Sequence, residues 1–348
     1  MGEQREGEGP RRVPRPVRSA REVWRAFRVS PFLPATVVTL IVAAGAGLFA
    51  GSYTYAMANP TPRHIPAAVI GAPASAVKRA QFVQGMEKAL GASLELHPYR
   101  NYAQALHAVN EQKTFAILEE RRGRARLDLS SASGASVAQL LAEAAPRVGR
   151  SVGVPVVVTD IKPLQRGDPR GLAIFYISLA SVVVGFIGAV QLSVHAKELR
   201  PAERIVFTIV YALLGGFSIC AIVDWGLGAL RLPFIESWLI LALTMFTSGM
   251  VFSMFNALIQ RWALLPTWGL MVMLGNPSSG GAVSWPLLPS LLGTIGRWLP
   301  PGAAVNAQHT AVYFRHYQHP FPFVVLAVWA TVASTIFWVW RRRHPGGR

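Results

Sequence analysis

Long apolar runs with almost no charge alternate with polar stretches along this 348-residue chain. Five of the runs are each long enough to cross about 30 Å of hydrocarbon as a helix; they lie at 34–57, 171–192, 205–225, 234–258 and 321–340. A sixth run, 262–274, reaches only about 20 Å at 1.5 Å per residue and needs the segment after it to complete a crossing. The pattern predicts an α-helical integral membrane protein with six transmembrane helices.

The segment between the first two runs has a different pattern, because charge returns and no run is long enough to cross a membrane. Short apolar stretches bounded by turn residues predict strands at 66–71, 93–97, 115–119, 126–130 and 155–160. Helices are predicted between them at 75–90, 102–112 and 136–148. This order predicts an α/β domain, residues 58–170, inserted between the first and second membrane helices.

Composition supports the membrane assignment. Hydrophobic residues make up 52% of the chain and charged residues only 15%, against about 25% charge in a soluble domain. This argues against a soluble enzyme and against disorder as the dominant state. The single cysteine, Cys220, allows no disulfide framework, zinc knuckle or iron–sulfur site.

The net charge of +17 is typical of a nucleic-acid-binding chain only if the chain is soluble. In a membrane protein, basic flanks meet anionic headgroups and set the orientation of the helices. We therefore expect membrane lipid as a partner and no nucleic acid.

Basic residues at the two ends predict the topology. Eight arginines precede the first run, and 341–343 follow the last one. By the positive-inside rule, we expect a multi-pass protein of the cell membrane with both termini in the cytoplasm and the segment 58–170 outside. The five further helices then fall in 171–343, and 344–348 forms a cytoplasmic tail. Residues 56–58 (AMA) resemble a signal-peptidase site, but the apolar run before them is longer than a typical h-region, which favours an uncleaved anchor.

The tail before the first run, residues 1–33, contains a predicted amphipathic helix. Ser19 and Glu22 have the spacing of a capping box. After the cap, Arg21, Arg25 and Arg28 share a face opposite the apolar side chains. These arginines either couple the helix to a cytoplasmic partner or anchor it among lipid headgroups.

An apolar segment broken by glycine and proline follows the short run. Such backbone is tolerated at membrane depth only where protein or a water-filled cavity covers it. We expect a re-entrant hairpin near 275–302 on the outer side, with these candidate pathway residues: Asn276, Pro277, Gly280, Gly281, Arg297, Pro300, Pro301 and Gly302.

Four stretches carry a resemblance to a known family. They are 63–71 (RHIPAAVIG), 167–172 (GDPRGL), 274–281 (LGNPSSGG) and 298–303 (WLPPGA). With them, residues 20–343 resemble the membrane (permease) subunit of type-two ABC exporters, in the phage-infection-protein-like branch. The resemblance implies a basic amphipathic helix, a first span, a large external domain and five more spans.

The resemblance also implies a function. Such a permease exports an amphipathic or lipid-like substrate, works as a homodimer or with a second permease, and is driven by a separate cytoplasmic ABC ATPase subunit. The sequence has no G-x-x-x-x-G-K-[ST] motif to bind ATP itself, so we expect no directly bound cofactor and ATP only through the partner. The family's contacts with the ATPase carry over to Arg21–Arg28 and to Lys197, Glu198 and Arg200, although a plain positive-inside loop explains the latter three equally.

Two other function classes stay open at this point. The chain is a non-transporting scaffold or receptor whose external domain binds a cell-envelope partner, or a membrane enzyme that acts on lipids. Some members of the resembling branch have no assigned ATPase, which keeps the first alternative open. The sequence contains no paired carboxylates, nucleophile elbow or Ser/His/Asp order, so we expect no catalysis.

Overall fold

The computed structural model describes residues 21, 24, 28, 30, 32–57, 64–70, 76–121 and 124–344. Expectations for Arg25 and for the chain ends lie outside these residues. The contacts divide the chain into two compact units, Met1–Ala50 and Gly51–Arg348. Helix α2, Phe32–Met57, contains the boundary between them.

Five helices in the described part are long and apolar enough to cross a membrane, which is consistent with a multi-pass membrane protein. They are α2, α6 (Ala173–His195), Pro201–Gly226, Phe234–Trp262 and α12 (Phe321–Arg343). The third comprises α7 (Pro201–Cys220) and a π-turn, Ala221–Gly226; the fourth comprises α8 (Phe234–Ile259) and a 3₁₀ turn, Gln260–Trp262.

The sixth predicted span differs from these five helices. Its apolar helix, Leu264–Leu274, is shorter, and it consists of α9 (Leu264–Trp268) followed by a π-helical turn (Gly269–Leu274). Pro266 lies in the first turn of α9, where a backbone N–H has no carbonyl partner within the helix, so its missing N–H costs no helical hydrogen bond. The count of six spans therefore stays a prediction.

Helix α8 is the most enclosed of the five and packs against α6, α7, α12 and the shorter helix α11 (Pro300–Tyr313). Small residues let the backbones approach closely. A Cβ on Gly185 would lie 2.5 Å from the Met245 carbonyl oxygen. Where the helices touch, the Ser248 hydroxyl donates to the Val182 carbonyl at 2.7 Å. Small residues and interhelical hydroxyl bonds are the usual means of packing helices in lipid.

Between α2 and α6 the chain forms a five-stranded sheet in the order β2-β1-β3-β4-β5. The strands are β1 (His64–Ile70), β2 (Ser93–Pro98), β3 (Ala116–Arg121), β4 (Arg124–Leu129) and β5 (Val156–Asp160). Strand β1 runs parallel to β2 and β3, β3 pairs antiparallel with β4, and β4 pairs parallel with β5. The antiparallel pair is the β3–β4 hairpin, in which Leu118 lies opposite Leu127.

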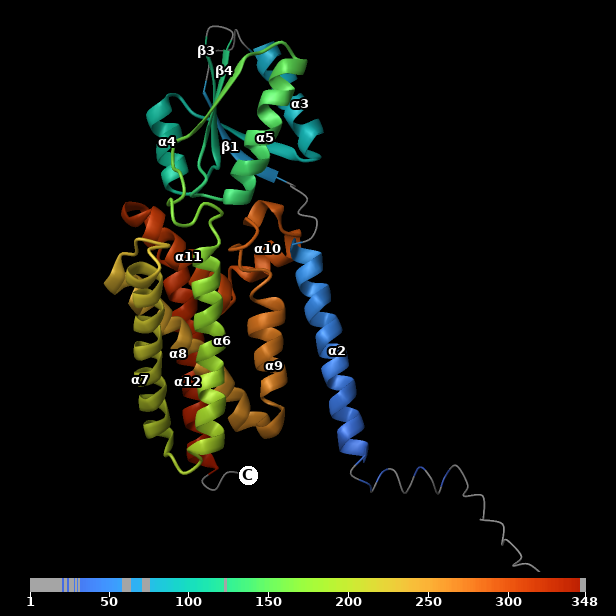
Figure 1. The fold of residues 1–348 in the computed structure, drawn as a ribbon, viewed down its shortest axis with the longest axis vertical. Coiled ribbons are helices and arrows are strands. Elements are labelled where there is room, and N and C mark those ends of the chain that lie inside the picture. Colours follow the sequence, from blue (N-terminus) through green and yellow to red (C-terminus); the bar gives the residue numbers. More distant parts are fainter. Residues whose placement is uncertain are drawn as a thin grey trace, which may run out of the picture. The chain divides into compact units, whose positions relative to one another are not determined.

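Helices cover both faces of this sheet (Figure 1). Helices α3 (Ala76–Leu90) and α5 (Ala135–Ser151) pack on one face through a core that includes Phe82, Met86 and Leu141. Helix α4 (Tyr102–Asn110) packs on the other face, where Val109 meets Ile117. The strands and helices predicted for this segment are all present in the predicted order; we call residues 64–160 the α/β segment.

Residues 275–302, the predicted hairpin, are irregular at first and then helical; we call them the hairpin below. Turns and bends at 275–284 lead into a 3₁₀ turn (Trp285–Leu287), then α10 (Ser290–Gly296) and α11. Gly280 has φ +80°, a conformation that favours glycine. A Cβ on Gly296 would overlap the Ser278 carbonyl oxygen, so α10 packs directly on the turn that precedes it.

Candidate functional site

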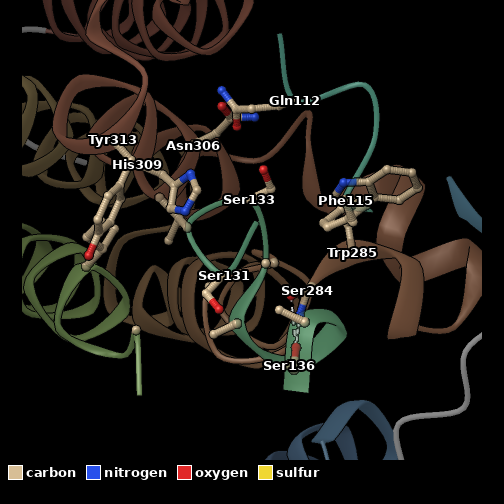
Figure 2. A pocket seen from close by; sticks show the side chains of 18 of the residues that line it. Gln112, Phe115, Ser131, Ser133, Ser136, Ser284, Trp285, Asn306, His309 and Tyr313 are labelled. Atoms are coloured by element: carbon tan, nitrogen blue, oxygen red, sulfur yellow. Dashed lines mark hydrogen bonds between the residues drawn. The ribbon is translucent and has the colours of Figure 1, made fainter. Parts of the chain in front are cut away.

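A cavity of about 1030 Å³ lies where the α/β segment meets the hairpin and α11 (Figure 2). Its walls come from α5 and the loop before it, from the linker that leads into α6, and from the hairpin and α11. Lining residues include Gln112, Phe115, Ser131, Ser133, Ser136, Arg170, Leu172, Ile174, Gly280, Gly281, Ser284, Trp285, Arg297, Trp298, Val305, Asn306, His309 and Tyr313.

Serines form one wall of the cavity and also connect its two sides. The Ser136 hydroxyl lies 2.9 Å from the Ser284 hydroxyl and accepts the Ser284 backbone N–H at 3.0 Å. Close packing next to this pair requires a glycine, because a Cβ on Gly134 would lie 2.6 Å from the Ser284 hydroxyl and 2.7 Å from the Phe115 ring. The loop before α5 therefore positions small polar side chains beside the hairpin.

Aromatic rings and an arginine form a second wall. The Phe115 and Trp285 ring centroids lie 5.8 Å apart, and the Arg297 guanidinium lies 4.5 Å from the Trp285 ring centroid. A cation over a tryptophan face is attracted by the ring quadrupole. This part of the cavity therefore presents flat apolar surface with one positive charge.

Helix α11 supplies polar groups that are uncharged at neutral pH. Burial lowers the pKa of His309 to about 4, although a hydrogen bond with the Ala132 backbone opposes this shift. Burial raises the pKa of Tyr313, whose hydroxyl accepts the Gln165 backbone N–H at 3.4 Å. Asn306 and Gln112 both line this cavity (Figure 2), and the Gln112 amide nitrogen is buried without a partner among the described residues.

The arrangement suits an amphipathic ligand, because hydroxyls, amides and a neutral imidazole alternate with aromatic and aliphatic surface. Apolar walls with a few placed polar groups are the usual composition of a small-molecule site. Within the part of the chain that the structure describes, no group of three or more His, Cys, Asp or Glu side chains could hold a metal ion.

Of the eight predicted hairpin residues, four line the cavity and four are buried nearby. Gly280, Gly281, Arg297 and Gly302 line the cavity. The others are buried beside it: the Asn276 amide donates to the Tyr53 hydroxyl at 2.5 Å, Pro277 is buried in the turn, and Pro300 and Pro301 are buried in the first turn of α11.

The predicted coupling residues of the loop after α6 do not line the cavity. Lys197, Glu198 and Arg200 are exposed in the loop between α6 and α7, at the end of α6 opposite to cavity residues Leu172 and Ile174. In the other unit, Arg21 and Arg28 are helical and exposed, whereas Arg25 lies outside the described residues.

Sequence reasoning missed the half of the cavity that comes from the α/β segment and α11, including Ser131, Ser136, Asn306 and His309. The run SSASGAS at 130–136 was a usable signal, since small polar residues between a strand and a helix form a tight loop. His309 had no such signal, because its neighbours in sequence are ordinary helix residues. Comparison with known proteins adds no assignment: no protein-family model, characterised protein or solved structure matches this chain.

Proposed function

We propose that this chain is the permease subunit of an ABC-type exporter. It moves an amphipathic or lipid-like molecule out of the cytoplasm or the inner leaflet, and a separate ATPase subunit supplies the energy. The observation that carries the proposal is the cavity at the junction of the α/β segment with the hairpin and α11. The motifs at 274–281 and 298–303, which resemble those of type-two permeases, contribute residues to its walls.

An exported amphiphile needs a path that accepts both of its parts. The cavity offers rings for the apolar part, such as Trp285, and hydrogen-bonding groups for the polar part, such as Asn306 and Ser284. Binding a polar group in a dry site is costly unless it is hydrogen-bonded, so the mixed walls favour a two-part ligand. On this proposal, the substrate occupies the cavity immediately before it is released.

Helix α6 supports coupling between the cavity and an ATPase. Cavity residues Leu172 and Ile174 lie at its start, and the exposed loop with Lys197 and Arg200 follows its end. The helix has 23 residues, which gives a rigid rod of about 35 Å. On this proposal, a movement of the loop caused by the ATPase is transmitted to the cavity through α6 alone.

The proposal includes a topology. Six spans place both termini in the cytoplasm and the α/β segment, with the cavity, outside the cell membrane. The permease works as a homodimer or with a second permease, in contact with lipid and without nucleic acid. It carries no catalytic site and meets ATP only through its partner.

One observation favours the second candidate, a scaffold whose external segment binds a cell-envelope partner. Strand β5 is an edge of the sheet, and its Val157 side chain is 54% exposed. An exposed apolar edge strand can accept a strand from another protein.

Purification of the intact chain from its native membrane, followed by mass spectrometry of what accompanies it, separates these candidates. The exporter proposal expects a P-loop ATPase subunit that is lost when Lys197 and Arg200 are both replaced by Glu. The scaffold candidate expects an envelope protein, no ATPase, and no effect of that double change. Retention of the ATPase by the double variant would show that Lys197 and Arg200 are not needed to bind the ATPase, which would contradict the proposed role of the loop.

A further inference from the structure

Arg204 is a buried cation in the first turns of α7. Only 5% of its surface is exposed, and it is the fourth residue of a helix that begins at Pro201. A buried guanidinium is strongly unfavourable unless paired and hydrogen-bonded, and arginine cannot escape this by losing its proton. Burial of this side chain therefore requires groups that pair with its charge and accept its hydrogen bonds.

Protein groups satisfy the guanidinium only in part. Its Nη2 donates to the Ala196 carbonyl at 3.2 Å, while its Nε is buried and has no partner among the residues that the structure describes. Among the described residues no carboxylate lies within the ion-pair distance of Arg204. The Thr208 hydroxyl donates to the Arg204 carbonyl and leaves the guanidinium unaffected.

The surroundings add positive charge. Helix α12 packs against α7 and carries Arg341, Arg342 and Arg343 in its last turn, and the N-terminal end of α7 carries the positive end of the helix dipole. The nearest acid along the helix is Glu203, which is turned to Arg200: it accepts the Arg200 backbone N–H at 2.8 Å and lies 3.7 Å from the Arg200 side chain. Within the described part of the chain, Arg204 thus has no anionic partner.

We propose that Arg204, Arg341 and the first turn of α7 form a binding site for the phosphate of a membrane-lipid headgroup. An oxyanion matches the planar donors of arginine and also favours a helix N-terminus. A lipid is the source because α7 begins and α12 ends here, and both are long enough to span a membrane, which puts the site at headgroup depth. The inference depends neither on which side is cytoplasmic nor on the exporter proposal.

Aromatic residues around the end of α12 agree with that depth. The Arg342 guanidinium lies 4.4 Å from the Trp338 ring centroid, and Trp340 is partly exposed. Tryptophan with arginine is the usual composition of the membrane–water interface. An acidic side chain of a partner protein is the rival occupant.

The test measures lipid retention by the intact purified protein with native mass spectrometry, together with its thermal unfolding. The probes are phosphatidylglycerol, phosphatidylcholine and inorganic phosphate. We expect phosphatidylglycerol to be retained and to raise the unfolding temperature, with weaker effects from phosphatidylcholine and none from phosphate alone. Binding by phosphate alone, with no added effect of the lipid, would overturn the lipid assignment.

Variants locate the site. Arg204→Gln should lower phosphatidylglycerol retention about tenfold, the usual loss for one charge-assisted hydrogen bond. Arg200→Gln is the matched control, because that side chain is 84% exposed on the same helix end and should retain the lipid. If Arg204→Gln fails to fold, Arg341→Gln supplies the second reading and should also weaken retention. Unchanged retention in the variants that fold, or equal loss in Arg200→Gln, would overturn the site and favour a protein partner.

Discussion

The Ser136 hydroxyl at the start of α5 lies 2.9 Å from the Ser284 hydroxyl, 148 residues further along the chain. The same hydroxyl accepts the Ser284 backbone N–H at 3.0 Å. Two hydrogen bonds therefore hold the α/β segment against the irregular part of the hairpin, at the wall of the cavity. This contact fixes the distance between the two sides of the candidate site.

Ser136→Ala removes both bonds and leaves the Ser284 N–H without this partner. Since each bond contributes about 1 kcal/mol, we expect the free energy of unfolding to fall by about 1–2 kcal/mol. Hydrogen exchange at 275–284 should also speed up. Ser131→Ala is the control, because Ser131 lines the same cavity with no hydroxyl bond to the hairpin. Equal effects of the two changes would contradict the role of the pair.

Gly296→Ala tests the packing of α10 on the hairpin turn. The added methyl overlaps the Ser278 carbonyl oxygen, so the backbone of one element has to move. We expect a loss of about 3 kcal/mol in the free energy of unfolding and poor recovery of folded protein. Gly269→Ala serves as the comparison, since its Cβ would meet no described atom within 4 Å. A Gly296→Ala protein as stable as Gly269→Ala would show that α10 does not pack as described.

His309 should make stability depend on pH. Its pKa is about 4 when folded against 6.5 ordinarily, so between these values the unfolded chain binds more protons. Stability from this group is complete above pH 6.5 and is lost as the pH falls toward 4. We expect a loss of about 2 kcal/mol by pH 5. Thermal unfolding of His309→Gln measured at pH 7.5 and 5 should lack this part of the dependence; identical pH profiles of variant and parent would contradict it.

Hydrophobic patterning was sufficient to predict the five long apolar helices and the strands and helices of the α/β segment. The apolar run 171–192 became α6, and the stretch 93–97 became β2, because burial of a helix face or a strand face determines these patterns locally. The break after the short apolar helix was also visible, since Gly280 takes the positive φ that glycine permits.

The cavity was not predictable in the same way. Ser136 and Ser284 are brought together by the packing of distant segments, and no local pattern carries that information. The same holds for His309, whose lowered pKa comes from burial by the α/β segment as well as by its own helix. Similarly, Arg204 has no ion pair among the described residues because the Glu203 carboxylate is turned to Arg200, which a list of charges along the helix does not reveal.

Topology is open to a direct chemical test in a Cys220→Ala background, which removes the only cysteine, itself buried. Arg124→Cys lies at the start of β4 and Arg200→Cys in the loop before α7, both exposed. A membrane-impermeant maleimide should label the first in intact cells and the second only after permeabilisation. The reverse pattern would place the α/β segment in the cytoplasm.

The most direct test of the exporter account is the rate of ATP hydrolysis by the chain and its copurified ATPase, reconstituted together in lipid nanodiscs. Gly281 lines the cavity, and a Cβ there would lie 3.0–3.1 Å from Phe175 and Val305, so Gly281→Val narrows the proposed path. Gly269→Val is the matched control. The account predicts that hydrolysis falls about tenfold or more in Gly281→Val, the loss expected for misplacing a coupled step by a fraction of an ångström, and stays near the parent rate in Gly269→Val. Equal hydrolysis in folded Gly281→Val and parent, or no ATPase with the chain at all, would contradict it.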